Sequence, residues 1–199
     1  LGLETAGPEH PVHENLTDVL TEVDRLEAQV KGILNFARPF EPRLEPVDLP
    51  ELLIAVIDTM APQLDAGHVT AALETSPSLP AVLADPSHVR QVFQELIANA
   101  IQAMPGGGRV TLSAQATHNG VPRVRVDITD TGPGVPPQIR DRIFQLFMTT
   151  KRTGTGVGLA VVRKILERHG GSVTLEGRTG PGACFVVELP LALRGAGGA

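Results

Sequence analysis

The sequence has 199 residues, a formal net charge of −5 at pH 7, and neither Trp nor Tyr. A chain of this length can bury the core of one ordinary α/β domain with a helical appendage, whereas two full domains would be crowded. The acidic balance, with no basic run and no aromatic stacking platform, argues against nucleic acid as a partner.

Cysteine content and hydropathy set the expected compartment. Cys184 is the only cysteine, so no internal disulfide can form, which favours a reducing compartment. No stretch approaches the roughly 18 consecutive apolar residues of a membrane helix. We expect a cytoplasmic chain without a membrane segment, whose parent protein has any inner-membrane anchor elsewhere.

The first expected element is a long helix within residues 14–38. Apolar residues recur along it at alternating spacings of three and four, which is typical of a helix that packs against other helices. They are Leu16, Val19, Val23, Leu26, Val30, Ile33 and Ala37. Four prolines between residues 39 and 50 then predict a stiff, extended connector. We place a domain boundary between residues 46 and 47.

Strand-like and helix-like periods alternate from Val47 onward, which predicts an α/β layer structure in one domain. We expect helices at 49–65, 86–104 and 156–169. Strands are expected near 68–74, 81–84, 108–117, 122–130, 172–177 and 184–189. Glycine-containing turns are expected at 106–108, 119–120 and 180–182, and Asn119-Gly120 predicts a hairpin.

The helix expected at 86–104 has a regular polar face. Gln91, Glu95 and Asn99 recur every fourth position, opposite an apolar stripe. Carboxylate and amide oxygens at this spacing suit Mg²⁺, which takes one or two protein ligands and completes its shell with phosphates and water. Taken alone, an ordinary solvated face is the better interpretation, because every amphipathic helix has one.

Asp130 ends the strand expected at 122–130 in the register of its apolar residues, so its side chain points inward. A buried carboxylate needs hydrogen-bond donors, and the exocyclic amine of adenine is one. Two glycines without a Cβ follow in Thr131-Gly132-Pro133-Gly134, where backbone can approach a ligand closely. A simple turn explains this segment about equally well.

A second glycine cluster, Gly154 to Leu159, leads directly into a helical pattern. Free N–H groups at such a helix start form a site for phosphate. The cluster lacks the Gly-Lys-Ser/Thr of a P-loop and the strand context of a Rossmann turn. Upstream, Lys151 and Arg152 can add positive charge, and the segment after Phe144-Gln145-Leu146-Phe147 resembles a short lid with both Phe side chains as packing anchors.

Taken in chain order, these four motifs resemble the N box, first glycine box, F box and second glycine box of sensor histidine kinases, members of the Bergerat or GHKL superfamily. The resemblance implies an α+β fold, a two-layer sandwich in which about three helices pack on a mixed sheet. Residues 47–199 would be the ATP-binding catalytic domain. Residues 1–46 would hold the connector and the second helix of a dimerisation and histidine-phosphotransfer domain, as in nitrogen-regulator-type kinases.

The resemblance also implies a role for each motif residue. Asn99 would coordinate Mg²⁺, Asp130 would receive the adenine amine, and Glu95, Asn99 and Lys151 would form the catalytic set. Glu95 replaces a second Asn of the N box, so it is either a further metal ligand or a general base. The implied ATP-binding residues are Asn99, Asp130, Gly132, Gly134, Phe147, Thr150, Lys151, Gly154, Thr155, Gly156, Val157, Gly158 and Leu159.

The expected function is transfer of the ATP γ-phosphate, with Mg²⁺, to a histidine. The family's phosphoacceptor stands in a His-Glu-Leu/Ile-Arg/Lys-Asn-Pro sequence that is absent here, so the acceptor helix is expected elsewhere in the same protein or its dimer partner. The implied partners are a response regulator receiver domain and a second copy of the parent protein. Alternatives are an ATP hydrolase that uses Glu95 and a nucleotide-binding module without turnover.

Overall fold

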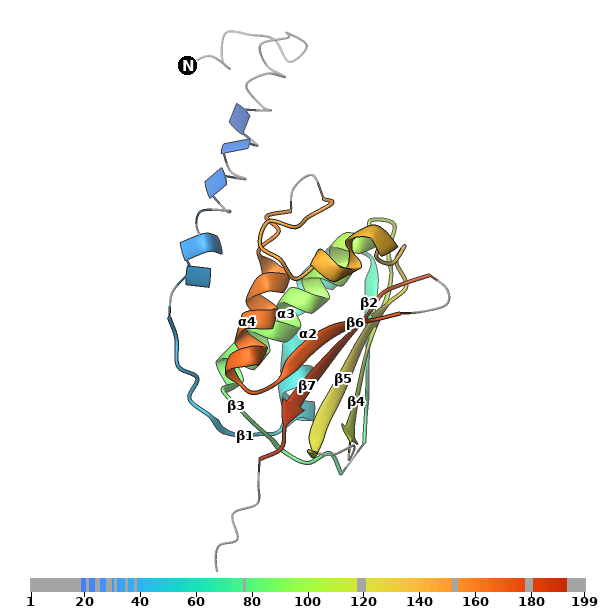
Figure 1. Ribbon diagram of the computed structural model, residues 1–199. Helices are drawn as coiled ribbons and strands as arrows, with labels where there is room; N and C mark the ends of the chain where they lie inside the picture. Colours follow the sequence, from blue (N-terminus) through green and yellow to red (C-terminus); the bar gives the residue numbers. More distant parts are fainter. Residues whose placement is uncertain are drawn as a thin grey trace, which may run out of the picture.

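The computed structural model describes residues 19, 20, 22, 23, 26, 27, 30, 32–34, 36, 37, 39–76, 78–117, 121–151, 154–177 and 181–192. All of the described residues between 19 and 37 are helical, as the apolar spacing predicts. Figure 1 shows them in blue, beside the body formed by the rest of the chain. None of the described helices is both long and apolar enough to cross a membrane.

A five-stranded mixed sheet forms one layer of the fold. Its strands run in the order β2 (Val69–Thr75), β4 (Gly108–Thr117), β5 (Arg123–Asp130), β7 (Cys184–Pro190) and β6 (Ser172–Glu176). The β2 and β4 strands are parallel, and the other neighbours are antiparallel. In the central strand β5, Val124, Val126, Ile128 and Asp130 are buried while the alternate residues are half-exposed, so one face of the sheet is covered.

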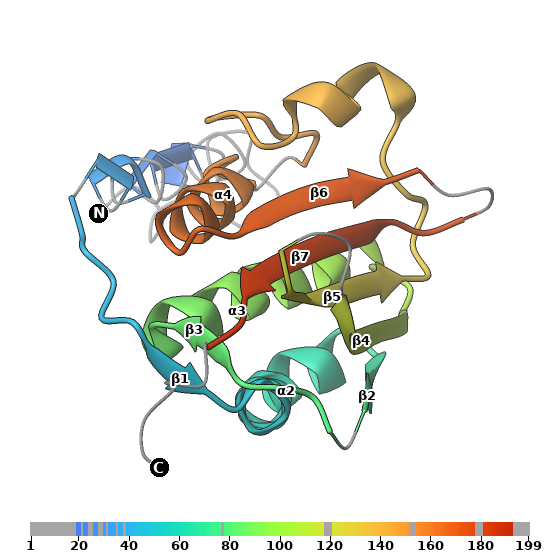
Figure 2. The same cartoon turned by 60° about the horizontal axis from the view of Figure 1, so that its bottom comes forward.

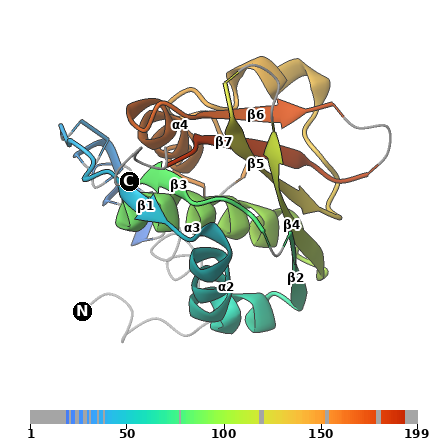
Figure 3. The same cartoon turned by 90° about the horizontal axis from the view of Figure 1, so that it is seen from below.

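Three helices cover that face: α2 (Leu49–Ala66), α3 (Pro86–Ala103) and α4 (Gly158–Arg168). Figures 2 and 3 show them on the same side of the sheet, with α3 between the other two. The α2 and α3 helices begin in the same way, because Asp48 and Asp85 each accept hydrogen bonds from first-turn N–H groups and a proline follows in the first turn. Phe93, Leu96 and Ile97 of α3 are completely buried.

A small antiparallel sheet of β1 (Glu45–Val47) and β3 (Val82–Ala84) joins the connector to this body. The sequence predicted no strand at 45–47, because Pro46 has no N–H to donate to a ladder. The strand is short and pairs on one side only, where that loss is tolerated. It spans the boundary expected after residue 46, and that boundary stays a prediction.

The predicted elements lie within two residues of the observed ones. The largest shift is at α4, which begins at Gly158 because Gly156 has φ = 68°, outside the helical region. The hairpin is confirmed by Thr117 pairing with Arg123, although its Asn119-Gly120 turn lies outside the described residues. A 3₁₀ helix, η1 (Pro137–Arg142), was not predicted.

Candidate functional site

A pocket of about 390 Å³ opens between α3, the segment that follows β5, and the start of α4. In Figure 1 that segment, which carries η1, is drawn in gold at the upper end of these two helices. Most of the residues singled out from the sequence line this pocket. They are Glu95, Asn99, Asp130, Gly134, Thr150, Lys151, Gly154, Thr155, Gly156, Gly158 and Leu159.

Three of the singled-out residues do not line the pocket. Gly132 lies beside Asp130, and Val157 is 4% exposed and faces Gly32 of the N-terminal helix. Phe147 is 51% exposed and has φ = 67°. The prediction that both Phe side chains anchor the lid by packing is therefore wrong for Phe147. It is correct for Phe144, whose ring meets Phe185 edge-on at 6.3 Å.

Asp130 is 5% exposed and held by two backbone amides. Its Oδ1 accepts hydrogen bonds from the N–H groups of Gly132 at 2.8 Å and Ala183 at 3.2 Å. A Cβ on Gly132 would lie 2.9 Å from that oxygen, so only glycine allows this approach. Within the described part of the chain no donor reaches Oδ2. The carboxylate is thus oriented, with one oxygen left for a ligand.

Apolar side chains form the wall around Asp130. Val135, Ile139 and Ile143 come from the segment around η1, and Phe185 comes from β7. This wall was not predicted from the sequence, although Val135, Ile139 and Ile143 are spaced four residues apart, as on one face of a helix. A flat apolar ring that carries an amine would fit between this wall and the free oxygen of Asp130.

The polar end of the pocket is built from the last turns of α3 and the loop of residues 148–151. The Lys151 ammonium donates hydrogen bonds to Asn99 Oδ1 at 2.5 Å, Asn99 O at 3.3 Å and Gln102 Oε1 at 3.0 Å. Burial lowers the pKa of Lys151, and the negative charge of Asp130 opposes that shift. Gln102 was missed by the sequence analysis, because its partner lies 49 residues away. Arg152 lies outside the described residues.

Glu95 faces the start of α4 from one turn before Asn99. A Cβ on Gly158 would lie 2.6 Å from Glu95 Oε2, so the absence of a side chain at this position lets the carboxylate approach the helix start. Burial raises the pKa of Glu95. Among the described residues no side chain caps the first turn of α4, and its N–H groups are therefore available to an anion.

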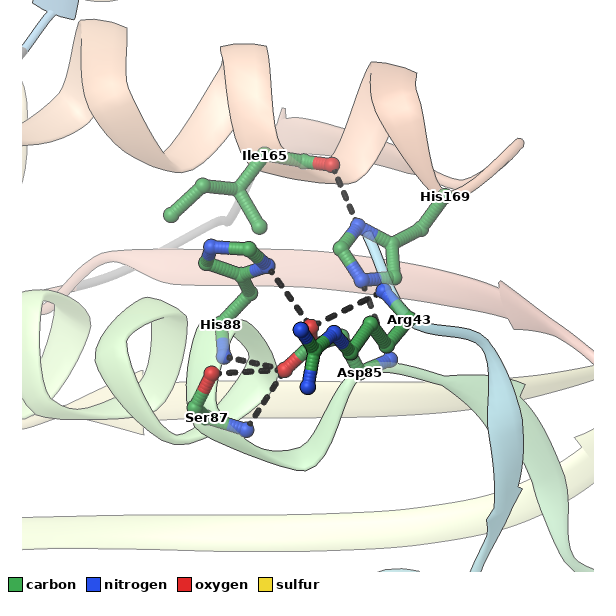
Figure 4. A network of polar contacts seen from close by, with 6 residues as sticks. All are labelled: Arg43, Asp85, Ser87, His88, Ile165 and His169. Atoms are coloured by element: carbon green, nitrogen blue, oxygen red, sulfur yellow. Dashed lines mark hydrogen bonds and ion pairs between the residues drawn. The ribbon is translucent and has the colours of Figure 1, made fainter. Parts of the chain in front are cut away.

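A second polar cluster, at the opposite end of α3, does not contribute to this pocket (Figure 4). Asp85 Oδ1 accepts from Ser87 and His88, and Oδ2 accepts from the Arg43 N–H at 3.0 Å. Burial alone would raise the pKa of Asp85, but these hydrogen bonds outweigh it and lower the pKa to about 2. His169 Nε2 accepts the Asp85 N–H at 3.1 Å, which ties the end of α4 to the start of α3.

Comparisons with known proteins agree with this geometry. Residues 84–193 match the model of the histidine kinase-, DNA gyrase B- and HSP90-like ATPases. The sensor histidine kinase ZraS of Salmonella typhimurium is 33% identical over 182 residues, which are 92% of this chain and 39% of ZraS.

Solved structures of histidine kinases superpose on the chain. Full-length ShkA in complex with AMPPNP does so with a TM-score of 0.75 and 36% identity, over 96% of this chain and 41% of that chain. The histidine kinase ThkA in complex with the response regulator TrrA does so with a TM-score of 0.76 and 27% identity, over 95% of this chain and 54% of that chain.

The chain therefore belongs to the family of histidine kinase-, DNA gyrase B- and HSP90-like ATPases. Within it, the chain contains the ATP-binding catalytic domain of a sensor histidine kinase, and it spans 39% of the length of ZraS. The predicted α+β fold, with three helices on a mixed sheet, is confirmed.

Proposed function

We propose that this domain binds Mg·ATP in the 390 Å³ pocket and transfers the γ-phosphate to a histidine on a helix outside this chain. One observation carries the proposal: a single pocket joins an oriented buried carboxylate, Asp130, to the uncapped N-terminus of α4. The first suits the base of ATP and the second its phosphates. The complex of ShkA with AMPPNP, an ATP analogue, supports the same assignment.

At the base end, Asp130 Oδ2 would accept a hydrogen bond from the exocyclic amine of adenine. The backbone amides of Gly132 and Ala183 hold the other oxygen, so the carboxylate needs no rearrangement before it binds. Val135, Ile139 and Ile143 would cover the purine ring and exclude water from the hydrogen bond. Gly134 would let backbone approach the ring, whereas Gly132 would act through Asp130.

At the phosphate end, the N–H groups of Gly156, Gly158 and Leu159 would bind phosphate oxygens, and Lys151 would neutralise their charge. Gly154, Thr155 and Thr150 line the same end of the pocket. Transfer of a phosphoryl group depends mainly on position and on charge neutralisation. A neutral histidine nitrogen presented in line with the γ-phosphate would complete the reaction.

The residues at this end also fit Mg²⁺. No group of three or more His, Cys, Asp or Glu side chains among the described residues could hold a metal by itself. Mg²⁺ bound to a nucleotide needs only one or two protein oxygens, and Asn99 Oδ1 already binds a cationic ammonium group. Asn99 would be the ligand, and the metal would neutralise phosphate charge. Glu95, one turn away, would be a further ligand or a general base.

The wider assembly is part of the same proposal. Apolar residues of the N-terminal helix, Val19, Val23, Leu26 and Val30, are each more than half exposed. Such a face suits pairing with the phosphoacceptor helix and with a second subunit in a four-helix bundle. A receiver domain would take the phosphoryl group from the histidine, as the complex of ThkA with TrrA suggests. A kinase that consumes ATP would work on the cytoplasmic side of any membrane anchor.

The proposal is tested by phosphoryl transfer from Mg·ATP bound to this chain to a histidine on a second protein. A separately produced fragment that carries the phosphoacceptor helix is mixed with this chain and labelled Mg·ATP, and acid-labile phosphohistidine is measured together with free phosphate. We expect phosphohistidine and little free phosphate. Rapid release of phosphate that depends on Glu95 would instead identify a hydrolase. Binding of ATP with neither product would identify a nucleotide-binding module.

A further inference from the structure

The Lys151 ammonium is fully coordinated by α3. An ammonium group has three donors, and three oxygens lie within hydrogen-bond distance, namely Asn99 O, Asn99 Oδ1 and Gln102 Oε1. Both acceptor residues belong to the last turns of one helix, whereas Lys151 lies in a loop about fifty residues later. The contact therefore ties the loop of residues 148–151 to α3.

Hydrogen bonds within the loop of residues 148–151 position the Lys151 side chain towards α3. The Thr149 hydroxyl accepts a hydrogen bond from the Lys151 N–H at 3.1 Å, and the Lys151 carbonyl accepts one from the Gly154 N–H at 3.3 Å. Asp130 adds a favourable negative charge on the far side of the pocket. The Gln102 side chain makes no other hydrogen bond within the described part of the chain, so its interaction with Lys151 is its one polar contact there.

Lys151 and a metal ion compete for the same oxygen. A Mg²⁺ ligand oxygen lies about 2.0–2.1 Å from the metal, so an ammonium group on the same Asn99 Oδ1 would stand within a few ångströms of a divalent cation. Two cations at such a distance repel strongly in a partly buried site. The two therefore exclude each other at Asn99.

We propose that Asn99 and Gln102 hold the Lys151 ammonium as a latch in the nucleotide-free protein, and that Mg-bound nucleotide opens this latch and moves Lys151 onto the phosphates. The inference rests on the proposed function, because it takes Asn99 as the metal ligand. It assigns Gln102 as a positioning residue that stabilises only the nucleotide-free arrangement. The latch thus opposes binding of Mg-nucleotide, and weakening it should tighten binding.

The sign of that effect separates the latch from a direct role of Gln102. If Gln102 bound the nucleotide or the metal, Gln102→Leu would weaken the binding of Mg·ADP. If Gln102 only holds Lys151, Gln102→Leu should tighten it by about tenfold, the low end of the effect of one hydrogen bond to a charged group, because Gln102 is exposed. Adenosine, which has no phosphate and recruits no metal, should bind equally to both proteins.

The experiment compares the full chain with Gln102→Leu and with Gln91→Leu, the same substitution at another exposed position of α3 that lies off the nucleotide pocket. Amide hydrogen exchange of residues 149–151 is measured without nucleotide, and calorimetry gives affinities for Mg·ADP and adenosine. We expect exchange about tenfold faster in Gln102→Leu only, with tighter Mg·ADP binding. Gln102→Glu, which adds a negative charge at the latch, should slow the exchange.

Unchanged exchange in Gln102→Leu, or weaker binding of Mg·ADP, would overturn the latch. The exchange measurement needs no nucleotide, so it decides on the latch even if the proposed function fails. Loss of all nucleotide binding by the unsubstituted chain would overturn the proposed function instead, and the two failures are therefore distinct.

Discussion

A buried carboxylate costs free energy unless its oxygens are hydrogen-bonded, and the described residues meet this condition at only one oxygen of Asp130. The same side chain is thus both a structural acceptor for two amides and an open acceptor in the pocket. Its inward position could be predicted from the sequence, because strands alternate their faces and Asp130 falls in the apolar register. The amide of Ala183 could not, since it is brought to Asp130 by the pairing of β5 with β7.

For Asp130→Asn we expect ADP affinity to fall by about 10- to 100-fold, as for a hydrogen bond to a charged group. The amide oxygen can still accept from Gly132 and Ala183, so its NH₂ group would face the pocket and oppose the adenine amine. Calorimetric titration with ADP measures the loss, and thermal unfolding of the same variant checks that the fold is kept. An affinity equal to that of the unsubstituted chain would show that Asp130 does not bind adenine.

Glu95 differs from Asp130, because its carboxylate faces a helix start where phosphates are expected. Burial raises its pKa, and a raised pKa makes the carboxylate a better proton acceptor. If it is a base, Glu95→Gln should keep Mg·ATP affinity and lower phosphoryl transfer by roughly 10²- to 10⁴-fold. If it is a metal ligand, affinity should fall too. Measuring Mg·ATP affinity and the rate of phosphoryl transfer distinguishes the two roles. If neither quantity changes in Glu95→Gln, Glu95 is neither a base nor a metal ligand.

At the scale of elements, helices and strands with a repeated apolar spacing could be predicted from the sequence, whereas short elements without such a repeat could not. The α2 and α3 helices have apolar stripes and aspartate caps, so their limits could be predicted closely. The η1 helix has six residues and no buried side chain, with prolines before and within it, and the apolar spacing of Val135, Ile139 and Ile143 is too short a signal to predict a helix there. The β1 strand exists only because β3 lies beside it, and such a tertiary cause has no local signal.

The joint between α3 and α4 should make stability depend on pH. Burial lowers the pKa of His169, while the Ile165 carbonyl opposes this shift and His88 adds to it. The unfolded state therefore binds the proton more readily, so stability is complete above the ordinary histidine pKa and falls as pH drops towards the folded value. Asp85, with its pKa lowered to about 2, adds a further loss below about pH 4.

We expect His169→Ala to lower the free energy of unfolding by about 2 kcal/mol near neutral pH, because the Asp85 N–H loses its buried acceptor. At a pH below the ordinary histidine pKa the difference from the unsubstituted chain should be smaller, since the unfolded state then binds the proton and His169 contributes less stability. Urea unfolding at the two pH values measures both quantities. A difference independent of pH would mean that His169 does not titrate in this range.

At the scale of the whole molecule, the nucleotide pocket and the connector attach to opposite ends of α3. Asn99 and Gln102 lie near its C-terminus, and Asp85, which binds the Arg43 N–H, caps its N-terminus. The α4 helix likewise contacts both regions. Gly158, at its start, lines the pocket. Lys164, further along, donates a hydrogen bond to the Phe36 carbonyl, and its Nζ lies 4.8 Å from the centroid of the Phe36 ring. The connector is thus attached to α3 and the N-terminal helix to α4, the two helices that line the pocket.

The exposed apolar face of that helix predicts self-association through it. Replacing Val23 and Val30 together by Glu should raise the dimer dissociation constant by about tenfold or more, because each buried valine contributes on the order of 1.5–3 kcal/mol. Affinity for ADP should not change, since neither residue lines the pocket.

Ile54→Glu provides the matched control, because Ile54 on α2 is 53% exposed, as Val30 is. Sedimentation equilibrium of the three proteins measures the effect. Equal weakening by Ile54→Glu would place the interface on the catalytic domain, and a chain that is monomeric before any substitution would remove the helix as a dimer contact. Ile54 is the only large apolar side chain of α2 that is largely exposed, whereas the repeated spacing on the N-terminal helix can bury several side chains against one partner.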